Sequence, residues 1–163
     1  MDLSESTVYE RLMNAAIRYI SFRLRSEKEI RDFIRQKLIK SHTTAPEVEA
    51  RVLHRLGELD YVNDEKFCEW WLSQRQGSKP KGIRLIRAEL AQKGIARALI
   101  DKAVSQSASD ERTLAYRAIN KKREIWRQLP LLARKKKLGD YLLRRGFSSD
   151  VVRGVVDDVV ENV

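Results

Sequence analysis

The sequence predicts an all-α fold built from three tandem three-helix units. An apolar frame recurs along the chain with a period of about 50 residues, in the range that stacked helical units show. Only 7 glycines and 3 prolines occur in 163 residues, so long loops are few and helices are favoured. Apolar residues recur at helical spacing, and the sequence shows no alternation of strands with helices.

The first unit is expected over residues 1–63 and begins with a helix in TVYERLMNAAIRYISFRL. Residues three or four positions apart are expected to share one face of this helix: Leu12, Ala15, Ala16, Tyr19 and Ile20. A serine or threonine followed three residues later by glutamate is the pattern of a capping box at a helix start. The pattern occurs at Thr7 with Glu10, at Ser26 with Glu29, and at Thr44 with Glu47 around Pro46.

The second unit is expected over residues 64–108 and the third over 109–163. Each begins with one helix: NDEKFCEWWLSQRQ, with its first residue Asn63 as the candidate N-cap, and DERTLAYRAINKKREIW, which follows the candidate N-cap Ser109. The C-terminal run VVRGVVDDVVENV is rich in β-branched residues, which read alone favours a strand. Its spacing matches that of the helix expected at 97–105, so we predict a helix there as well.

A glycine is expected to end the middle helix of the second and third units. Gly94 and Gly146 suit the left-handed position just after a helix, where a missing side chain avoids a steric penalty. The flanking apolar residues then make the hydrophobic contact of a Schellman ending. Apolar residues of the two copies match at a separation of 52 positions: Leu90 with Leu142, Ile95 with Phe147, Ile100 with Val152, and Val104 with Val156.

The first unit carries a degenerate copy of the same frame. Ile30 and Ile34 stand 56 positions before Ile86 and Leu90, whereas Val48 and Val52 stand 52 positions before Ile100 and Val104. We therefore expect an insertion of four residues around SHTTAP, with Leu38 in place of the glycine. One helical unit of about 50 residues cannot bury its apolar face alone, so the copies are expected to stack.

Several classes of site are excluded by the residues present. The single cysteine, Cys68, forms no internal disulfide, which fits a reducing compartment, and is expected to be an ordinary buried or half-buried thiol. His42 and His54 are too few and too scattered for a zinc or nucleophile site, and no Gly-rich phosphate loop occurs. We therefore predict no enzyme, no metal and no cofactor.

The ends and the hydropathy of the sequence bear on its location. The first residues, MDLSESTVYE, are acidic and polar and do not resemble a signal peptide. No apolar run approaches the roughly 20 residues of a membrane span. A cytoplasmic protein without a membrane partner is therefore expected.

Positive charge is concentrated toward the C-terminal half. The formal net charge is +10, and residues 112–145 contain 12 basic and only 2 acidic side chains. Such a surface suits a polyanion or an acidic protein surface, although solvated helix faces carry similar runs. A second basic cluster, RQGSKPKGIRLIR, joins a loop to a helix start and either holds an anion or is an ordinary connection. We expect Trp70 in the core and Trp126 as an exposed functional aromatic.

Three segments in order resemble the RecX family of regulatory proteins. They are AAIRYISFRLRSEKEIRDFIRQKL, VLHRLGELDYVNDEKFCEWWLSQR and KPKGIRLIRAELAQKGI, and the third is the most specific. Its matching residues include Gly82, Glu89, Lys93 and Gly94. The resemblance covers almost the whole chain. The chain departs from the pattern at Cys68, where a small alanine is usual, and at residues 38–39, where Leu-Ile replaces a Lys-Gly turn.

The resemblance implies a function that composition alone does not supply. RecX proteins bind the RecA recombinase, chiefly as a filament on single-stranded DNA, and typically inhibit its ATPase, strand-exchange and coprotease activities. They thereby restrain recombinational repair and the SOS response. The family fold is a curved array of three-helix units, and we expect a monomer here. Candidate contacts to RecA or DNA are taken from the basic clusters: Arg23, Arg25, Lys81, Arg84, Arg87, Lys121, Lys122, Arg123, Lys135, Lys136, Arg144 and Arg145.

A different class of function stays open beside this one. A general helical DNA-binding protein would use the basic third unit on phosphates without any need for RecA. The requirement for RecA in binding distinguishes the two.

Overall fold

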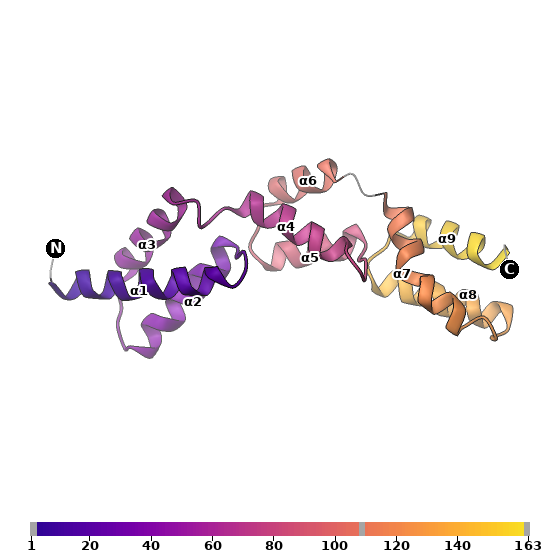
Figure 1. Ribbon diagram of the computed structural model, residues 1–163, viewed down its shortest axis with the longest axis horizontal. Helices are drawn as coiled ribbons and strands as arrows, with labels where there is room; N and C mark the ends of the chain where they lie inside the picture. Colours follow the sequence, from indigo (N-terminus) through magenta and orange to yellow (C-terminus); the bar gives the residue numbers. More distant parts are fainter. Residues whose placement is uncertain (1–2, 108–109, 162–163) are drawn as a thin grey trace.

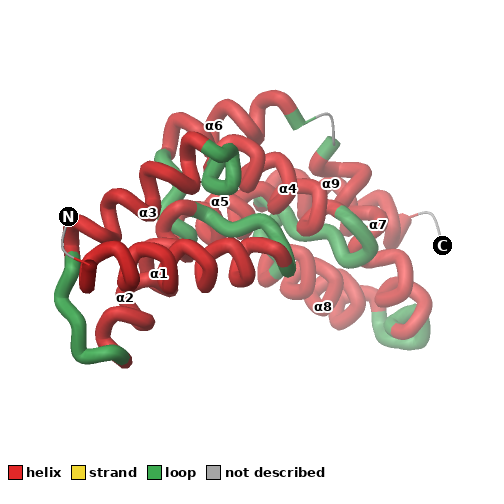
Figure 2. The backbone as a smooth tube through the Cα atoms, turned by 60° about the vertical axis from the view of Figure 1, so that its left-hand side comes forward, coloured by secondary structure: helices red, strands yellow, loops and turns green. Residues whose placement is uncertain are grey.

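The computed structural model describes residues 3–107 and 110–161, and within them it contains nine α-helices and no strand. The helices follow one another in an elongated row, with the two ends of the chain at opposite ends of the row (Figure 1). The tube view shows that the row is curved (Figure 2). The helices are α1 Leu3–Ser21, α2 Glu27–Lys40, α3 Pro46–Glu58, α4 Asp64–Gln76, α5 Ile83–Gln92, α6 Arg97–Gln106, α7 Glu111–Ile125, α8 Leu131–Arg144 and α9 Ser149–Glu161. The all-α prediction is confirmed.

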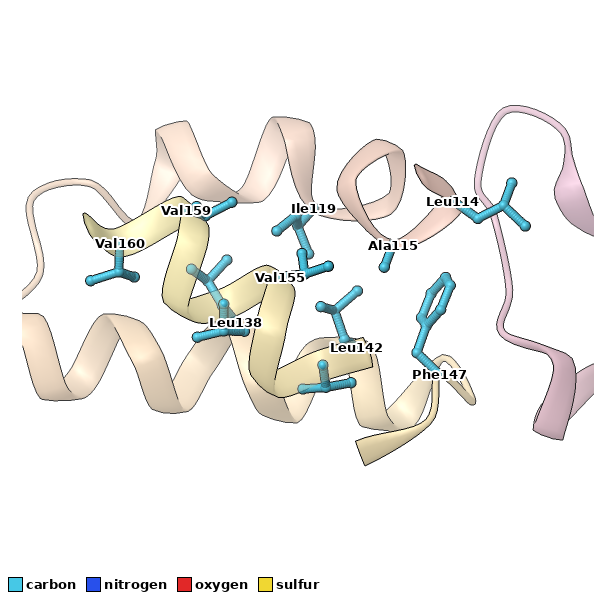
Figure 3. Close-up of a cluster of buried hydrophobic side chains, with 11 residues drawn as sticks. Leu114, Ala115, Ile119, Leu138, Leu142, Phe147, Val155, Val159 and Val160 are labelled. Atoms are coloured by element: carbon cyan, nitrogen blue, oxygen red, sulfur yellow. The ribbon is translucent and has the colours of Figure 1, made fainter. Parts of the chain in front are cut away.

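Three separate apolar cores lie along the row. One core is drawn from α1–α3, the next from α4–α6 and the last from α7–α9. In the last, Ile119, Leu138 and Val155 point toward one another from three helices (Figure 3). The boundaries 1–63, 64–108 and 109–163 remain our proposal for the units. The chain thus divides its hydrophobic burial among three small cores, as expected of stacked helical repeats.

The β-branched segment at the C-terminus is the helix α9, as predicted. Its valines at 152, 155, 156, 159 and 160 are all buried against α7 and α8. Burial of this valine face outweighs the weak intrinsic preference of β-branched residues for strands.

Some of the expected helix starts are correct and others are wrong. Ser26 and Glu29 form a complete capping box, and the Asn63 side chain accepts from the backbone N–H of Lys66 at 3.0 Å. Thr7 lies inside α1, so it does not begin that helix. The N-cap of α3 is Ala45 and not Thr44, because Pro46 occupies the first helical position.

The start of α7 is set by an aspartate. The Asp110 side chain accepts from the backbone N–H groups of Arg112 and Thr113 at 3.2 and 3.0 Å. The expected cap Ser109 lies outside the described residues.

The two predicted glycine endings are confirmed. Gly94 and Gly146 have φ values of 81° and 85°, in the left-handed region. The N–H of the next residue bonds to the carbonyl five residues back in the Schellman pattern, Ile95 to Leu90 at 3.2 Å and Phe147 to Leu142 at 3.2 Å.

The expected four-residue insertion in the first unit is wrong. The left-handed residue there is His42, with φ of 51°, and the N–H of Thr43 bonds to the Leu38 carbonyl at 3.0 Å. His42 stands 52 positions before Gly94, so Leu38 is the counterpart of Leu90 and not of the glycine. The period is 52 throughout, and α2 with 14 residues is one turn longer at its start than α5 with 10.

Neighbouring units meet through the start of one middle helix and the end of the next. The Ser26 hydroxyl, at the start of α2, donates to the Lys93 carbonyl at 2.7 Å, at the end of α5. The Gly82 N–H, at the start of α5, donates to the Arg145 carbonyl at 2.9 Å, at the end of α8. The glycines therefore serve a second purpose besides ending helices. A Cβ at Gly94 would lie 2.7 Å from Lys28, so a side chain there would separate the units.

The tryptophans in α4 differ from the expected arrangement. Trp71 is the buried one, with an exposed fraction of 7%, and Trp70 is only partly buried beside it. Adjacent helical residues point about 100° apart, so one face of α4 meets the core and the next borders the surface. In the described part of the chain, no helix combines the length and apolarity needed to cross a lipid bilayer.

Candidate functional site

Most of the twelve candidate cations are engaged within the fold. Five form ion pairs inside the chain: Arg23 with Glu29, Lys81 with Glu89, Arg87 with Asp101, Arg123 with Glu124, and Lys135 with Asp157. Two others contact different groups. Arg25 lies 4.0 Å above the Tyr19 ring, and Arg84 donates to the Leu143 carbonyl at 3.0 Å. Lys136 and Arg144 are exposed on α8.

The junction between the first and second units is neutralised by Glu29. Its carboxylate accepts from Arg23 of the same unit at 2.8 Å and from Lys93 of the next unit at 2.6 Å. Burial opposes ionisation of Glu29, but the hydrogen bonds from these two cations outweigh it and lower the pKa from 4.5 to about 2. The carboxylate therefore remains charged and links two units.

A second partly buried carboxylate, that of Glu89, holds the middle unit together. Glu89 accepts from the Trp71 indole N–H at 2.9 Å and from Arg75 at 2.7 Å, and it also pairs with Lys81. Burial again opposes its charge, but hydrogen bonds from Lys81, Arg75 and Trp71 lower the pKa of Glu89. Lys81 and Glu89 thus have a structural role within the second unit.

The junction between the second and third units contains a positively charged cleft. The cleft has a volume of about 610 Å³ and lies between the loop before α5 and the helices α7 and α8. We call it the basic cleft; its lining residues are Ser78, Lys79, Arg117, Ala118, Asn120, Lys121, Lys122, Tyr141 and Arg145. Five of these are cations and none is a carboxylate.

Two arginines of the third unit fix the loop of the second. One Arg145 nitrogen donates to the carbonyls of Lys79 and Pro80 at 2.9 and 2.8 Å. One Arg117 nitrogen donates to the Gly77 carbonyl at 3.0 Å. These bonds hold Lys79 beside the cations of α7. The cleft therefore exists only where the two units meet.

The structure brings together only part of the predicted set. Lys121, Lys122 and Arg145 line the basic cleft, and Lys79 belongs to the second basic cluster in the sequence. Arg117 was not predicted, although it stands four residues before Lys121 and so shares a face of α7 with it.

Trp126 is not the open aromatic platform that we expected. It is partly buried, and its ring meets the edge of Tyr141 at 6.0 Å. The Lys122 ammonium lies 5.5 Å from the centre of the Trp126 ring, so Trp126 makes a cation–π contact with a residue that lines the cleft.

The other features offer little chemistry. A smaller cavity of about 330 Å³ mixes Arg123, Arg127 and Arg134 with Glu124 and Asp158. Cys68 is buried, and burial together with nearby carboxylates raises the pKa of its thiol to about 11. Among the residues described, no group of three or more His, Cys, Asp or Glu side chains has a metal-binding arrangement.

Comparison with known proteins establishes the family. The model of the second three-helix domain of RecX matches residues 63–104, and that of the third three-helix domain matches residues 109–156. These matches together cover more than half of the chain. The chain belongs to the RecX family. The predicted family is confirmed, and so is the predicted repeat of three-helix units.

Relatives and solved structures agree with this assignment. The chain is 33% identical over 143 residues to "Regulatory protein RecX" of Streptococcus uberis, covering 87% of this chain and 53% of that protein. It is 31% identical over 147 residues to that of Bacillus subtilis, covering 90% and 54%. The chain therefore spans about half the length of the curated relatives it matches.

Two crystal structures share the fold. The RecX structure from Lactobacillus salivarius superposes with a TM-score of 0.79 at 21% identity, covering 97% of this chain and 99% of that chain. A second structure titled as regulatory protein RecX has a TM-score of 0.76 at 25% identity, covering 94% and 74%. The curved helical array is thus common to this chain and its relatives.

Proposed function

We propose that this chain is a regulatory protein that binds RecA, chiefly as the filament on single-stranded DNA, and inhibits its ATPase, recombinase and coprotease activities. Membership of the RecX family carries the proposal. Through RecA the protein would restrain DNA repair by recombination and the SOS response. It would act in the cytoplasm as a monomer, without catalysis and without a cofactor.

The shape and charge of the molecule support this function. Three cores in a curved row give a long surface rather than a single pocket, which suits contact with several subunits of a helical filament (Figure 2). The basic cleft adds cations that no lining carboxylate neutralises. We therefore propose a steric and electrostatic mechanism in which binding weakens as salt increases.

Co-sedimentation tests the proposal. RecA filaments assembled on single-stranded DNA are pelleted with this protein, beside the same DNA without RecA. We expect the protein to pellet with the filament at concentrations where the DNA alone retains much less of it. Equal pelleting with DNA alone would contradict a RecA partner.

A charge-reversed variant tests the part of the surface involved. Lys121→Glu, Lys122→Glu and Arg123→Glu together should weaken filament binding without loss of helicity, because none of the three side chains is buried in the core. Unchanged affinity with intact helicity would remove this part of α7 from the interface.

A general DNA-binding function is the second candidate. The basic cleft favours it, since five cations without a lining carboxylate suit phosphates whether or not RecA is present. Binding that depends only on DNA in the sedimentation experiment would select this function.

A further inference from the structure

We propose that the basic cleft is a phosphodiester site, which takes the backbone of a nucleic-acid strand and reads none of its bases. The inference deepens the proposed function and rests on it for the identity of the strand, the single-stranded DNA of the filament. The chemical group itself is inferred from the cleft alone.

The two junctions of the array differ in charge although they share a backbone geometry. At the first, Lys93 and Arg23 are neutralised by Glu29. At the second, Arg145 occupies the position of Lys93 at the end of the middle helix, and it bonds to carbonyl oxygens and lies over the Tyr141 ring without forming an ion pair. The five cations of the basic cleft therefore repel one another, and a bound anion would relieve that repulsion.

One carboxylate does lie at the second junction, outside the cleft lining. Glu111 accepts from the backbone N–H of Ile83 at 3.2 Å and from the hydroxyl of Ser148 at 3.3 Å. Glu111 holds the junction through these bonds; it does not line the cleft and forms no ion pair with the cleft cations.

The arginines and the lysines of the cleft have different tasks. Arg117 and Arg145 each use one guanidinium nitrogen on the carbonyls of the 77–80 loop, and their remaining N–H groups stay available. Within the described residues, the side chains of Lys79 and Lys121 form no ion pair and no hydrogen bond. We therefore assign Lys79 and Lys121, from two different units, as the main phosphate contacts.

The size of the cleft favours a strand over a single small anion. Its 610 Å³ falls within the roughly 300–1,000 Å³ of ordinary ligand sites, which exceeds the needs of one phosphate group. The cations that line it come from both units: Lys79 from the second, and Arg117, Lys121, Lys122 and Arg145 from the third. Successive phosphates of one backbone would meet them in turn.

No open aromatic face is available for a base. Tyr141 is the aromatic ring that lines the cleft, and Lys122 and Arg145 lie 5.9 and 5.1 Å from its centre. The edge-on contact with Trp126 occupies the ring further. Contacts to phosphate carry no sequence information, so binding should be independent of sequence.

The test is the binding of a fluorescently labelled single-stranded oligonucleotide to the full chain without RecA, followed by anisotropy over a range of salt. The variant Lys79→Gln/Lys121→Gln removes two proposed contacts. Each phosphate contact on a single strand contributes about 0.7 to the slope of log K against log salt, so the slope should fall by about 1.4. The same relation predicts about 25-fold weaker binding at about 0.1 M salt.

A matched control removes the same charge elsewhere. Lys40→Gln/Arg97→Gln changes two exposed cations of the first and second units that do not line the cleft. We expect its slope to stay unchanged and both variants to keep wild-type helicity. An equal loss in both variants, or no loss in the cleft variant, would overturn the site. A loss that differs between homopolymer and mixed-sequence oligonucleotides would overturn the backbone-only reading.

Competition separates a strand from a free polyphosphate. Inorganic triphosphate is added at the same total phosphate concentration as unlabelled oligonucleotide. The proposal expects the oligonucleotide to compete far better, and equal competition would overturn the strand as the ligand. Because RecA is absent, these results stand apart from the proposed inhibition of RecA, which the wild-type protein tests separately.

Discussion

The substitution Gly82→Ala isolates the contact between the second and third units. Gly82 has φ of −72°, which alanine adopts without strain, and alanine already stands at the N-caps of α3 and α6. An added Cβ would nevertheless lie closer than 3.0 Å to backbone atoms of Gly146 and Phe147. Because these are backbone atoms, no change of side-chain rotamer can relieve the clash.

The cost follows from the separation that the new side chain imposes. Ordinary contact begins at 3.4 Å, so the two segments must part by half an ångström or more. The 2.9 Å hydrogen bond from Gly82 N–H to the Arg145 carbonyl would then exceed the usual range, and the Arg145 bonds to the loop would weaken with it. Losing these hydrogen bonds destabilises the closed junction by about 2 kcal/mol, which raises its opening equilibrium constant roughly 30-fold.

Hydrogen exchange measures that opening directly. Residues 77–85 should exchange roughly 30-fold faster in Gly82→Ala, by the same free energy. The helices that make the separate cores should keep their protection, because each core is drawn from one set of three helices. Unchanged exchange across residues 77–85 would refute the reasoning that this contact joins the units.

The remaining predictions concern an exposed glycine, the other junction and the cores. Gly57→Ala should raise the free energy of unfolding by about 0.5–1 kcal/mol, because a Cβ there meets nothing within 4 Å in the helix α3; thermal unfolding checks this. The pKa of Glu29 is lowered from 4.5 to about 2, so its stabilisation is complete above about pH 5 and is lost as pH falls toward 2; Glu29→Gln should abolish that part of the acid sensitivity. Leu142→Asp should cost more than about 3 kcal/mol by burying a charge, and a normal melting temperature would contradict the core assignment. Cys68 should resist thiol reagents at pH 8 until the protein is unfolded, because it is buried and the pKa of its thiol is raised to about 11; rapid labelling of the native protein would contradict this.

Features that depend on neighbouring residues were predictable from the sequence. The Schellman endings at Gly94 and Gly146 and the capping box at Ser26 use residues within one or two turns of a helix. The helix α9 was predictable because its valines repeat at helical spacing despite their preference for strands.

The register of the first unit was misread for a physical reason. A helix presents similar faces after each turn, so a shift of four residues still aligned Ile30 and Ile34 with apolar partners. The extra turn at the start of α2 and a histidine, His42, at the left-handed position concealed the true period of 52.

The basic cleft was beyond prediction because it forms between units. Lys79 and Lys121 are 42 positions apart, and no local pattern indicates that the loop of one unit faces a helix of the next. The sequence likewise did not distinguish cations that carry intramolecular ion pairs, such as Arg87 with Asp101, from those left without them.

The most direct test of the central claim is the RecA ATPase on single-stranded DNA, with this protein titrated in at moderate salt. We predict inhibition at substoichiometric to equimolar ratios of protein to RecA, with DNA in excess, because the proposed target is the filament. Inhibition that disappears whenever free DNA is saturating would contradict it, since the protein would then only compete for DNA.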